Sequence, residues 1–138
     1  MAIIKKTLVV LAVAGAIPLA VAGTAYADIP FNQPVNGNAT YYDSAGYGSC
    51  GTQINAATDY LVAVSPSYWT SANPNNDPLC SGVSVQVTYN GQTVTVPVKD
   101  QCPGCDASHI DLGKPVFVQL TGGTDLGDIP VTWQFVHS

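Results

Sequence analysis

The fold class is decided by a stretch that runs from Val83 to Val98 and reads VSVQVTYNGQTVTVPV. Apolar and polar residues alternate on both sides of the dipeptide Asn90-Gly91. Period-two alternation around Asn-Gly is a strong signal for a β-hairpin with a tight two-residue turn. The stretch therefore predicts two paired strands, each with one apolar and one polar face.

The rest of the chain predicts more strands and little helix. Beyond the first 27 residues, no long apolar stripe follows helical spacing, and Gly, Pro and Asn cluster in the connections. Many short strands joined by such turns indicate an all-β barrel or sandwich. We expect residues 28–38 to form a loose arm. Strands are predicted at 39–42, 60–65 and 131–136, with one short helix beginning at Pro66 and another spanning 114–120.

The beginning of the chain is built like a secretory signal peptide. Lys5 and Lys6 precede an apolar run over 7–21, and small residues flank a cleavage point at Ala25-Tyr26-Ala27. A membrane anchor is the alternative, but Pro18 and the short apolar run argue against it. We therefore expect a signal peptide at 1–27 and one secreted, extracellular domain at 28–138.

The charge of the expected mature domain narrows its partners. Removal of residues 1–27 leaves Lys99 and Lys114 against nine aspartates, a net charge of about −7 with histidine neutral. Such a surface repels nucleic acid and anionic membranes, so we expect neither as a partner. Neutral glycans and the clefts of other proteins remain possible partners. We expect a monomer with no cofactor.

Four cysteines lie in the expected domain: Cys50, Cys80, Cys102 and Cys105. An even count in an exported domain indicates two disulfides, and three connectivities are possible. We favour Cys50–Cys80 with Cys102–Cys105. A zinc site built from all four cysteines is the alternative. A redox role for the Cys-x-x-Cys pair would need a βαβ context, and the pattern contains none.

Four motifs in order resemble the double-psi β-barrel superfamily, which includes rare-lipoprotein-A-like proteins, barwin-like proteins and the first domain of expansins. They are Ala39-Thr40-Tyr41-Tyr42-Asp43, Gly48-Ser49-Cys50-Gly51, the run over 98–105, and His109-Ile110-Asp111-Leu112. The resemblance covers essentially the whole expected domain. It implies a six-stranded double-psi β-barrel with one or two short helices, two disulfides and a shallow groove on one side.

The resemblance also marks a polar groove. Its implied residues are Thr40, Tyr42, Asp43, Asp100, His109 and Asp111. Asp111 matches the position of the catalytic acid in related hydrolases, and Asp43 resembles the position of their base. Glycoside cleavage needs two such carboxylates, one on each side of the bond. Lytic-transglycosylase members keep a histidine early in the barrel, whereas 56–60 here reads Ala-Ala-Thr-Asp-Tyr. Turn capping is an equally good explanation for Asp100 and Asp111. We therefore assign no catalytic residue and no metal ligand.

A closer resemblance concerns the loop Ala72-Asn73-Pro74-Asn75-Asn76-Asp77-Pro78-Leu79-Cys80 and the opening Asp28-Ile29-Pro30. Both are similar to secreted papain-inhibiting members of the superfamily. The resemblance implies a non-enzymatic inhibitor of extracellular papain-type cysteine proteinases. A glycan-binding or expansin-like cell-wall protein is the alternative, and a glycan hydrolase ranks third. Expansins carry a second domain, and we expect no such domain within the 111 residues of 28–138.

Apolar residues around this loop are the predicted proteinase contacts. They are Tyr68, Trp69 and Leu79. A loop held by Cys80 and stiffened by prolines would bind at low cost in conformational entropy. Packing in the core is the alternative role for Trp69. The loops at 44–48 and 121–128 are rival contact sites.

Overall fold

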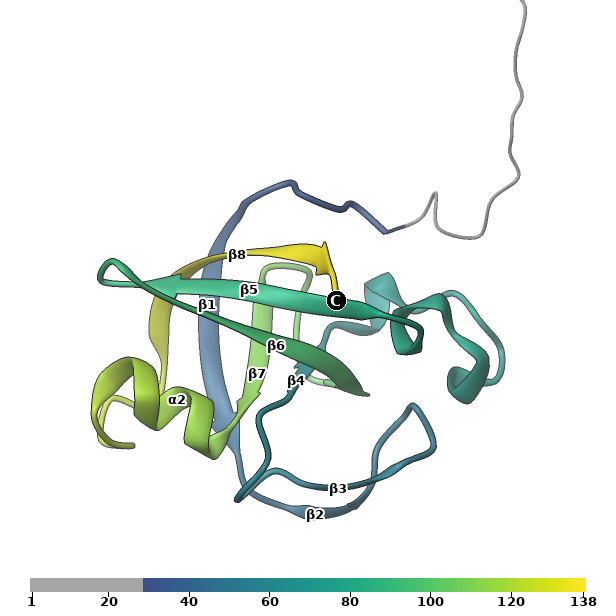
Figure 1. The fold of residues 1–138 in the computed structure, drawn as a ribbon, viewed down its shortest axis with the longest axis horizontal. Coiled ribbons are helices and arrows are strands. Elements are labelled where there is room, and N and C mark those ends of the chain that lie inside the picture. Colours follow the sequence, from purple (N-terminus) through teal and green to yellow (C-terminus); the bar gives the residue numbers. More distant parts are fainter. Residues whose placement is uncertain (1–28) are drawn as a thin grey trace, which may run out of the picture.

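Six strands close into a barrel in the computed structural model, which describes residues 29–138 (Figure 1). The order around the barrel is β1-β7-β4-β6-β5-β8, and β2 and β3 form a separate two-stranded sheet. The six-stranded closed barrel confirms the predicted fold class. The elements are β1 (Val35–Tyr42), β2 (Ala45–Tyr47), β3 (Gln53–Asn55), β4 (Val62–Val64), η3 (Pro66–Tyr68), η4 (Pro74–Asn76), η5 (Pro78–Cys80), β5 (Val83–Tyr89), β6 (Gln92–Gln101), β7 (His109–Gly113), α2 (Lys114–Thr121) and β8 (Ile129–His137).

The predicted hairpin is confirmed as β5 and β6. Tyr89 pairs with Gln92 across the turn, and Val85 pairs with Val96. Asn90 and Gly91 have φ values of 50° and 79°, the left-handed backbone that a type I′ turn requires. β6 continues past Val98 to Gln101, because its second half leaves β5 and pairs in parallel with β4.

The N-terminal arm differs from its prediction. β1 begins at Val35, and Val35 pairs with Trp133 of β8. Further upstream, the Asn32 amide donates to the Phe135 carbonyl at 2.8 Å, and Phe31 stacks on His137. The expected loose arm is therefore wrong from Phe31 onward, because partners some hundred residues away hold this segment in place. The predicted signal peptide lies outside the described residues.

The barrel interior is filled by the apolar faces of the strands. Ala39, Val62, Val85, Val96 and Leu112 are all buried. Trp133 and Phe135 of β8 project into the same core, where their rings meet edge to face at a centroid distance of 5.2 Å. The alternation on β5, β6 and β8 thus separates this core from solvent.

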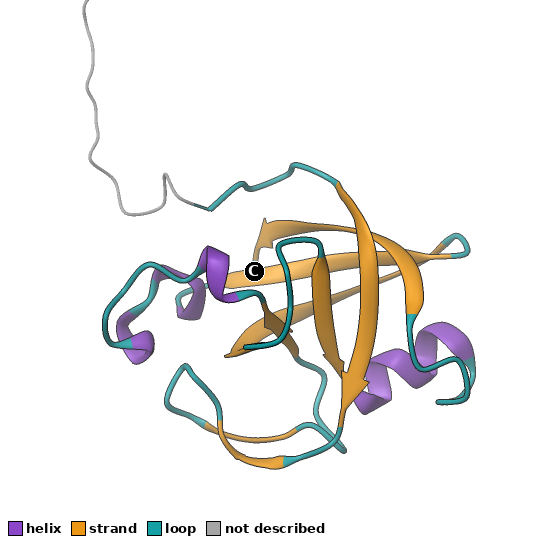
Figure 2. Ribbon diagram, turned by 180° about the vertical axis from the view of Figure 1, so that it is seen from behind, coloured by secondary structure: helices purple, strands orange, loops and turns teal. Residues whose placement is uncertain are grey.

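The helices are short and lie on opposite sides of the barrel (Figure 2). α2 begins after Gly113 and ends at Gly122, whose φ of 88° forms a left-handed cap. Its buried residues Val116, Phe117 and Leu120 cover one side of the core. The 3-10 helix η3 begins at Pro66 as expected. Among residues 29–138, no helix is long and apolar enough to cross a membrane.

Both favoured disulfides are present. Cys50 bonds to Cys80, and Cys102 bonds to Cys105. All four thiols are therefore committed, which contradicts the zinc alternative. The chain-entropy relation assigns about 3.5–4 kcal/mol to the longer loop and about 2 kcal/mol to the shorter one.

We predict that Gly37→Ala destabilises the fold by roughly 1–3 kcal/mol. A Cβ at this position would overlap the Ser108 carbonyl oxygen, so β1 or the segment before β7 would have to shift. Denaturant unfolding of both proteins measures the change. Gly123→Ala is the matched control, because a Cβ there meets nothing within 4 Å. Equal stability of Gly37→Ala and wild type would contradict this close approach of β1.

Candidate functional site

Parallel pairing of β1 and β7 assembles the first half of the groove. Thr40 lies opposite Asp111 in the register, and His109 lies two residues before Asp111 on the same strand face. The Thr40 hydroxyl donates to Asp111 Oδ1 at 3.0 Å and lies 2.8 Å from His109 Nε2. A hydroxyl has only one proton to donate. Because the Thr40 hydroxyl donates to Asp111, it can only accept from His109, so the imidazole must donate from Nε2.

Burial raises the pKa of the Asp111 carboxyl above its usual value. The Thr40 hydrogen bond and the nearby His109 oppose this shift, and Asp100 adds to it. Burial disfavours the charged form of a carboxyl group. Asp111 is therefore the groove carboxyl with a raised proton affinity.

The second half of the groove is centred on Asp100 of β6. Tyr42 donates its hydroxyl to Asp100 Oδ2 at 3.0 Å. The other oxygen, Oδ1, accepts from the Ser49 amide at 2.9 Å, the Ser49 hydroxyl at 3.1 Å and the Gln101 amide at 2.9 Å. Burial and the adjacent Asp100 carboxylate raise the pKa of Tyr42, so it stays a neutral donor. Asp100 thus acts mainly as a hub that holds β1, β6 and the segment around Ser49 together.

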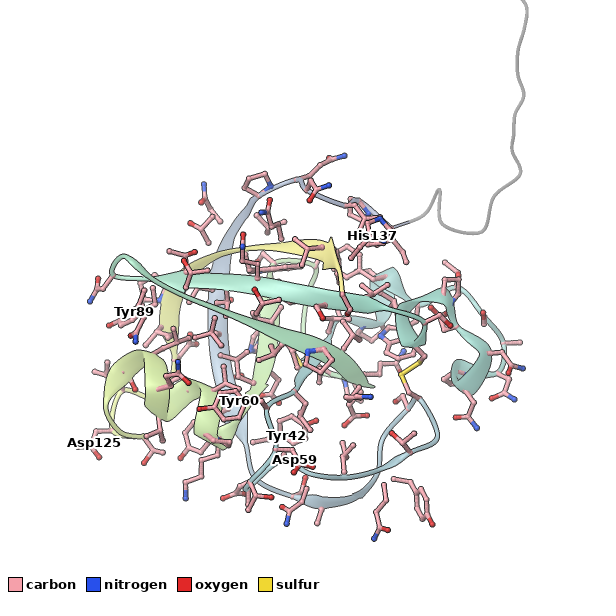
Figure 3. The ribbon with its side chains drawn as sticks, in the orientation of Figure 1. Tyr42, Asp59, Tyr60, Tyr89, Asp125 and His137 are labelled. Carbon is pink, nitrogen blue, oxygen red and sulfur yellow. A yellow bond between two sulfur atoms is a disulfide. The ribbon has the colours of Figure 1, made fainter. Side chains whose placement is uncertain are left out.

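Five of the six predicted groove residues come together in this way. The exception is Asp43, which is exposed in the connection between β1 and β2. Figure 3 shows the Tyr42 side chain between the barrel and the β2–β3 sheet. A cavity of about 70 Å³ lies there, lined by Tyr42, Ser44, Ala45, Gly46, Tyr47, Ile54 and Asp100. The groove presents one carboxyl of raised pKa, one imidazole and one phenol, which suits hydrogen bonding to hydroxyl-rich ligands.

The β2–β3 sheet and the loop after β4 form a second candidate surface. The Cys50–Cys80 disulfide joins them (Figure 3). They also touch next to the disulfide, where a Cβ on Gly51 would meet the Asn75 side chain. No strand was predicted between residues 43 and 59, so β2 and β3 are additional to the predicted elements. The sheet forms because Ala45 pairs with Asn55 and Tyr47 with Gln53.

The loop over 66–80 is organised by Asp77, for which the sequence predicted no separate role. Its side chain is 1 % exposed, and its carboxylate accepts from the backbone amides of Thr70, Ser71 and Leu79 at 2.7–3.0 Å. Hydrogen bonds to a charged acceptor are stronger than neutral ones. The Asp-Pro pair at 77–78 was the available signal, because Asp before Pro favours a capped turn.

The three predicted contact residues have different environments. Tyr68 is half-buried, donates its hydroxyl to the Ala107 carbonyl at 2.6 Å and packs on Trp133 and Phe135. Trp69 is also half-buried and lies with its indole nitrogen 3.4 Å from the Val64 carbonyl. Leu79 has no exposed surface. The expectation that Leu79 contacts a proteinase is therefore wrong, because its side chain packs in the core.

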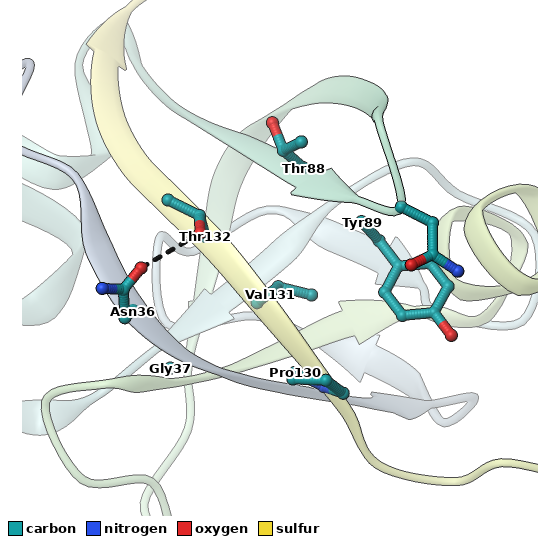
Figure 4. Close-up of a pocket in the computed structure, with 8 residues that line it drawn as sticks. Asn36, Gly37, Thr88, Tyr89, Pro130, Val131 and Thr132 are labelled. Atoms are coloured by element: carbon teal, nitrogen blue, oxygen red, sulfur yellow. Dashed lines mark hydrogen bonds between the residues drawn. The ribbon is translucent and has the colours of Figure 1, made fainter.

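A larger hollow of about 480 Å³ lies away from the groove, along β1, β5 and β8 (Figure 4). Asn36, Thr88, Tyr89, Pro130 and Thr132 are among its lining residues, and Thr132 donates to Asn36 at 3.1 Å. Its lining contains neither a carboxylate nor an imidazole. Within residues 29–138, no three His, Cys, Asp or Glu side chains are grouped to hold a metal ion.

Comparison with known proteins defines the class of this barrel. A family model described as lytic transglycolase, of the double-psi β-barrel type, matches residues 34–133. The chain therefore belongs to the double-psi β-barrel family.

Individual relatives narrow the comparison. The chain is 53% identical over 117 residues to the papain inhibitor of Streptomyces mobaraensis, which covers 84% of this chain and 81% of that protein. The solved structure of a Streptomyces papain inhibitor matches with a TM-score of 0.78 and 52% identity, over 80% of this chain and 100% of that one. An expansin of Clavibacter michiganensis matches with a TM-score of 0.61 and 31% identity, over 77% of this chain and 52% of that one.

We predict that NMR-monitored pH titration finds the Asp111 carboxyl titrating above pH 3.8, the ordinary value for Asp. Asp106 serves as the internal reference, because hydrogen bonds from Ser108 hold its pKa below the same value. Since the folded-state pKa of Asp111 is raised, its burial opposes folding increasingly as the pH rises through that pKa. Titration of Asp111 below Asp106 would contradict the described burial of the groove.

Proposed function

We propose that this chain is a secreted, non-enzymatic inhibitor of papain-type cysteine proteinases. The observation that carries the proposal is the 53% identity to the Streptomyces mobaraensis papain inhibitor, which spans 81% of that protein. An inhibitor needs no catalytic pair. It needs a rigid surface that enters the proteinase cleft without losing much conformational entropy.

The two loops joined by Cys50–Cys80 meet this requirement. Asp77 fixes the loop from inside by accepting three backbone amides, and Asn73 and Asp77 cap the successive 3-10 helices η4 and η5. We include the exposed edges of Tyr68 and Trp69 among the contacts. Leu79 supports them from the core.

An extracellular proteinase is the partner that fits this chain. Two disulfides favour an oxidising compartment, and the sequence of residues 1–27 favours export. We propose that the inhibitor acts as a monomer.

Titration of papain with the purified domain 28–138 tests the proposal. We expect strong inhibition of papain and at least tenfold weaker inhibition of trypsin, one decade being about 1.4 kcal/mol. Trypsin requires Lys or Arg in its primary pocket, and both lysines of the domain are half-buried, Lys99 in β6 and Lys114 at the start of α2. Unimpaired papain activity at micromolar concentrations of the domain would overturn the proposal, and equal potency on trypsin would overturn its selectivity.

Glycan binding is the second candidate function. The groove holds two adjacent hydrogen-bonded clusters. One consists of Thr40, His109 and Asp111, and the other contains Tyr42 and Asp100. The expansin of Clavibacter michiganensis has been solved as a mutant in complex with cellohexaose, and that structure matches this chain at 30% identity with a TM-score of 0.60. We infer that the groove retains the ability to bind a neutral polysaccharide weakly.

Sedimentation with insoluble cellulose and with peptidoglycan tests this second function. We expect measurable binding that Asp111→Asn reduces, and no release of soluble sugar from either glycan. Thr132→Ala, on the exposed wall by the larger hollow, is the control and should bind as wild type. Soluble sugar that appears with wild type and disappears with Asp111→Asn would instead establish a glycan-cleaving enzyme.

A further inference from the structure

We propose that Tyr47 of β2 is the principal anchor of the inhibitor, inserted into the substrate cleft of a papain-type proteinase. The β2–β3 sheet around it and the loop over 66–80 would form one contact surface, which we call the bridged face. This inference rests on the proposed inhibitory function and names the residue and element that carry it.

Exposure singles out Tyr47. Its side chain is 79 % exposed, against 48 % for Tyr60 and 58 % for Leu126, the other large exposed hydrophobic residues of the described chain. Tyrosine is a frequent interface anchor, because its large ring has only two side-chain torsions to restrict on binding. Tyr47 therefore offers the largest apolar gain on burial at a small entropic cost.

The backbone around Tyr47 is accessible and nearly bare. All three residues of β2 are exposed, and β2 pairs only with β3 within the described residues. Ala45 and Gly46 carry little or no side chain, and no atom lies within 4 Å of the position of a Cβ on Gly46. A strand with one free edge can pair with the extended backbone groups of a partner. β2 thus combines a free edge with one aromatic side chain.

The base of the sheet is held rigidly although its strands are short. The Gly48 amide donates to the Thr52 carbonyl and the Ala56 amide to the Ser44 carbonyl, both at 2.9 Å. Ser49 is bound to Asp100 of the barrel, and Cys50 is bound to Cys80. Gly48 packs so closely on β6 that a Cβ would lie 2.5 Å from the Lys99 carbonyl oxygen. Tyr47 is therefore presented on a preorganised support.

The bridged face is also nearly free of charge. Between residues 44 and 76, Asp59 is the single residue among Asp, Glu, Lys, Arg and His, although the expected mature chain has a net charge of about −7. Asp59 is used at the base of the sheet, where it accepts from the Asn55 amide at 2.8 Å. Asp77 is buried. An uncharged face suits an apolar cleft, and its binding should depend little on salt.

The rival loop at 121–128 lacks these properties. It carries Asp125 and Asp128 next to the exposed Leu126, and it follows α2 on the side of the barrel away from η3–η5 (Figure 2). It contains no cysteine, and both of its carboxylates are exposed, although Asp128 accepts from the Asn38 side chain at 3.0 Å. Leu126 is therefore a suitable comparison residue for Tyr47.

The test measures the papain inhibition constant for wild type, Tyr47→Ala, Tyr47→Phe and Leu126→Ala, with a fluorogenic peptide as substrate. We expect Tyr47→Ala to weaken inhibition at least tenfold, whereas Tyr47→Phe and Leu126→Ala stay within about threefold of wild type. Thermal unfolding verifies that each variant is folded. In the wild type, raising NaCl from 50 to 500 mM should change the constant by less than about twofold.

The outcomes separate the anchor from the proposed function. If the wild type fails to inhibit papain, both the proposed inhibitory function and the proposed anchor role of Tyr47 are wrong. If the wild type inhibits and folded Tyr47→Ala inhibits equally, the function stands and the anchor is wrong. Hydrogen exchange on the wild type gives a variant-free check: amides of 45–47 should be protected by papain. Unchanged exchange there would overturn the proposal.

Discussion

The barrel depends on one strand, β1, being held on both edges by strands from the far end of the chain. It pairs in parallel with β7 and antiparallel with β8. No free edge remains on it, which protects a small β protein from edge-to-edge association. Closure also requires Gly37, since any side chain there would overlap the backbone before β7. The same pairing that closes the barrel sets Thr40 beside His109 and Asp111 and so creates half of the groove.

Carboxylates have different hydrogen-bond partners in the groove and in the bridged face. In the groove, carboxylates face side chains that can also bind a ligand, as Asp111 does with Thr40. In the bridged face, the buried carboxylate of Asp77 serves only the backbone, and the outer surface stays neutral. Tyr47 and Tyr42 line the same small cavity, so the two regions adjoin. In the functions proposed here, the groove would bind a glycan and the adjoining bridged face would bind a proteinase, with one barrel core supporting both.

The Cys50–Cys80 disulfide stabilises the bridged face. Most of the loop over 66–80 and all of the β2–β3 sheet lie outside the six-stranded barrel. Segments of this kind would be costly to order by local contacts alone. The disulfide links the β2–β3 sheet to the loop over 66–80, and the hydrogen bond from Ser49 to Asp100 links the sheet to the barrel. Both bonds restrict the motion of these segments relative to the barrel. Rigid loops bind a cleft with a smaller entropic cost than mobile ones.

The sequence by itself determined the features that depend on neighbouring residues. Alternation and Asn90-Gly91 predicted the β5–β6 hairpin, Pro66 predicted the start of η3, and the helix predicted over 114–120 is α2. Its motifs also indicated the barrel family and five of the groove residues. Only the tertiary structure decided that β1 begins at Val35, that a small sheet carries Tyr47, and that Leu79 is buried. These features depend on burial and on contacts between distant segments, and no local pattern records which distant residue will lie opposite.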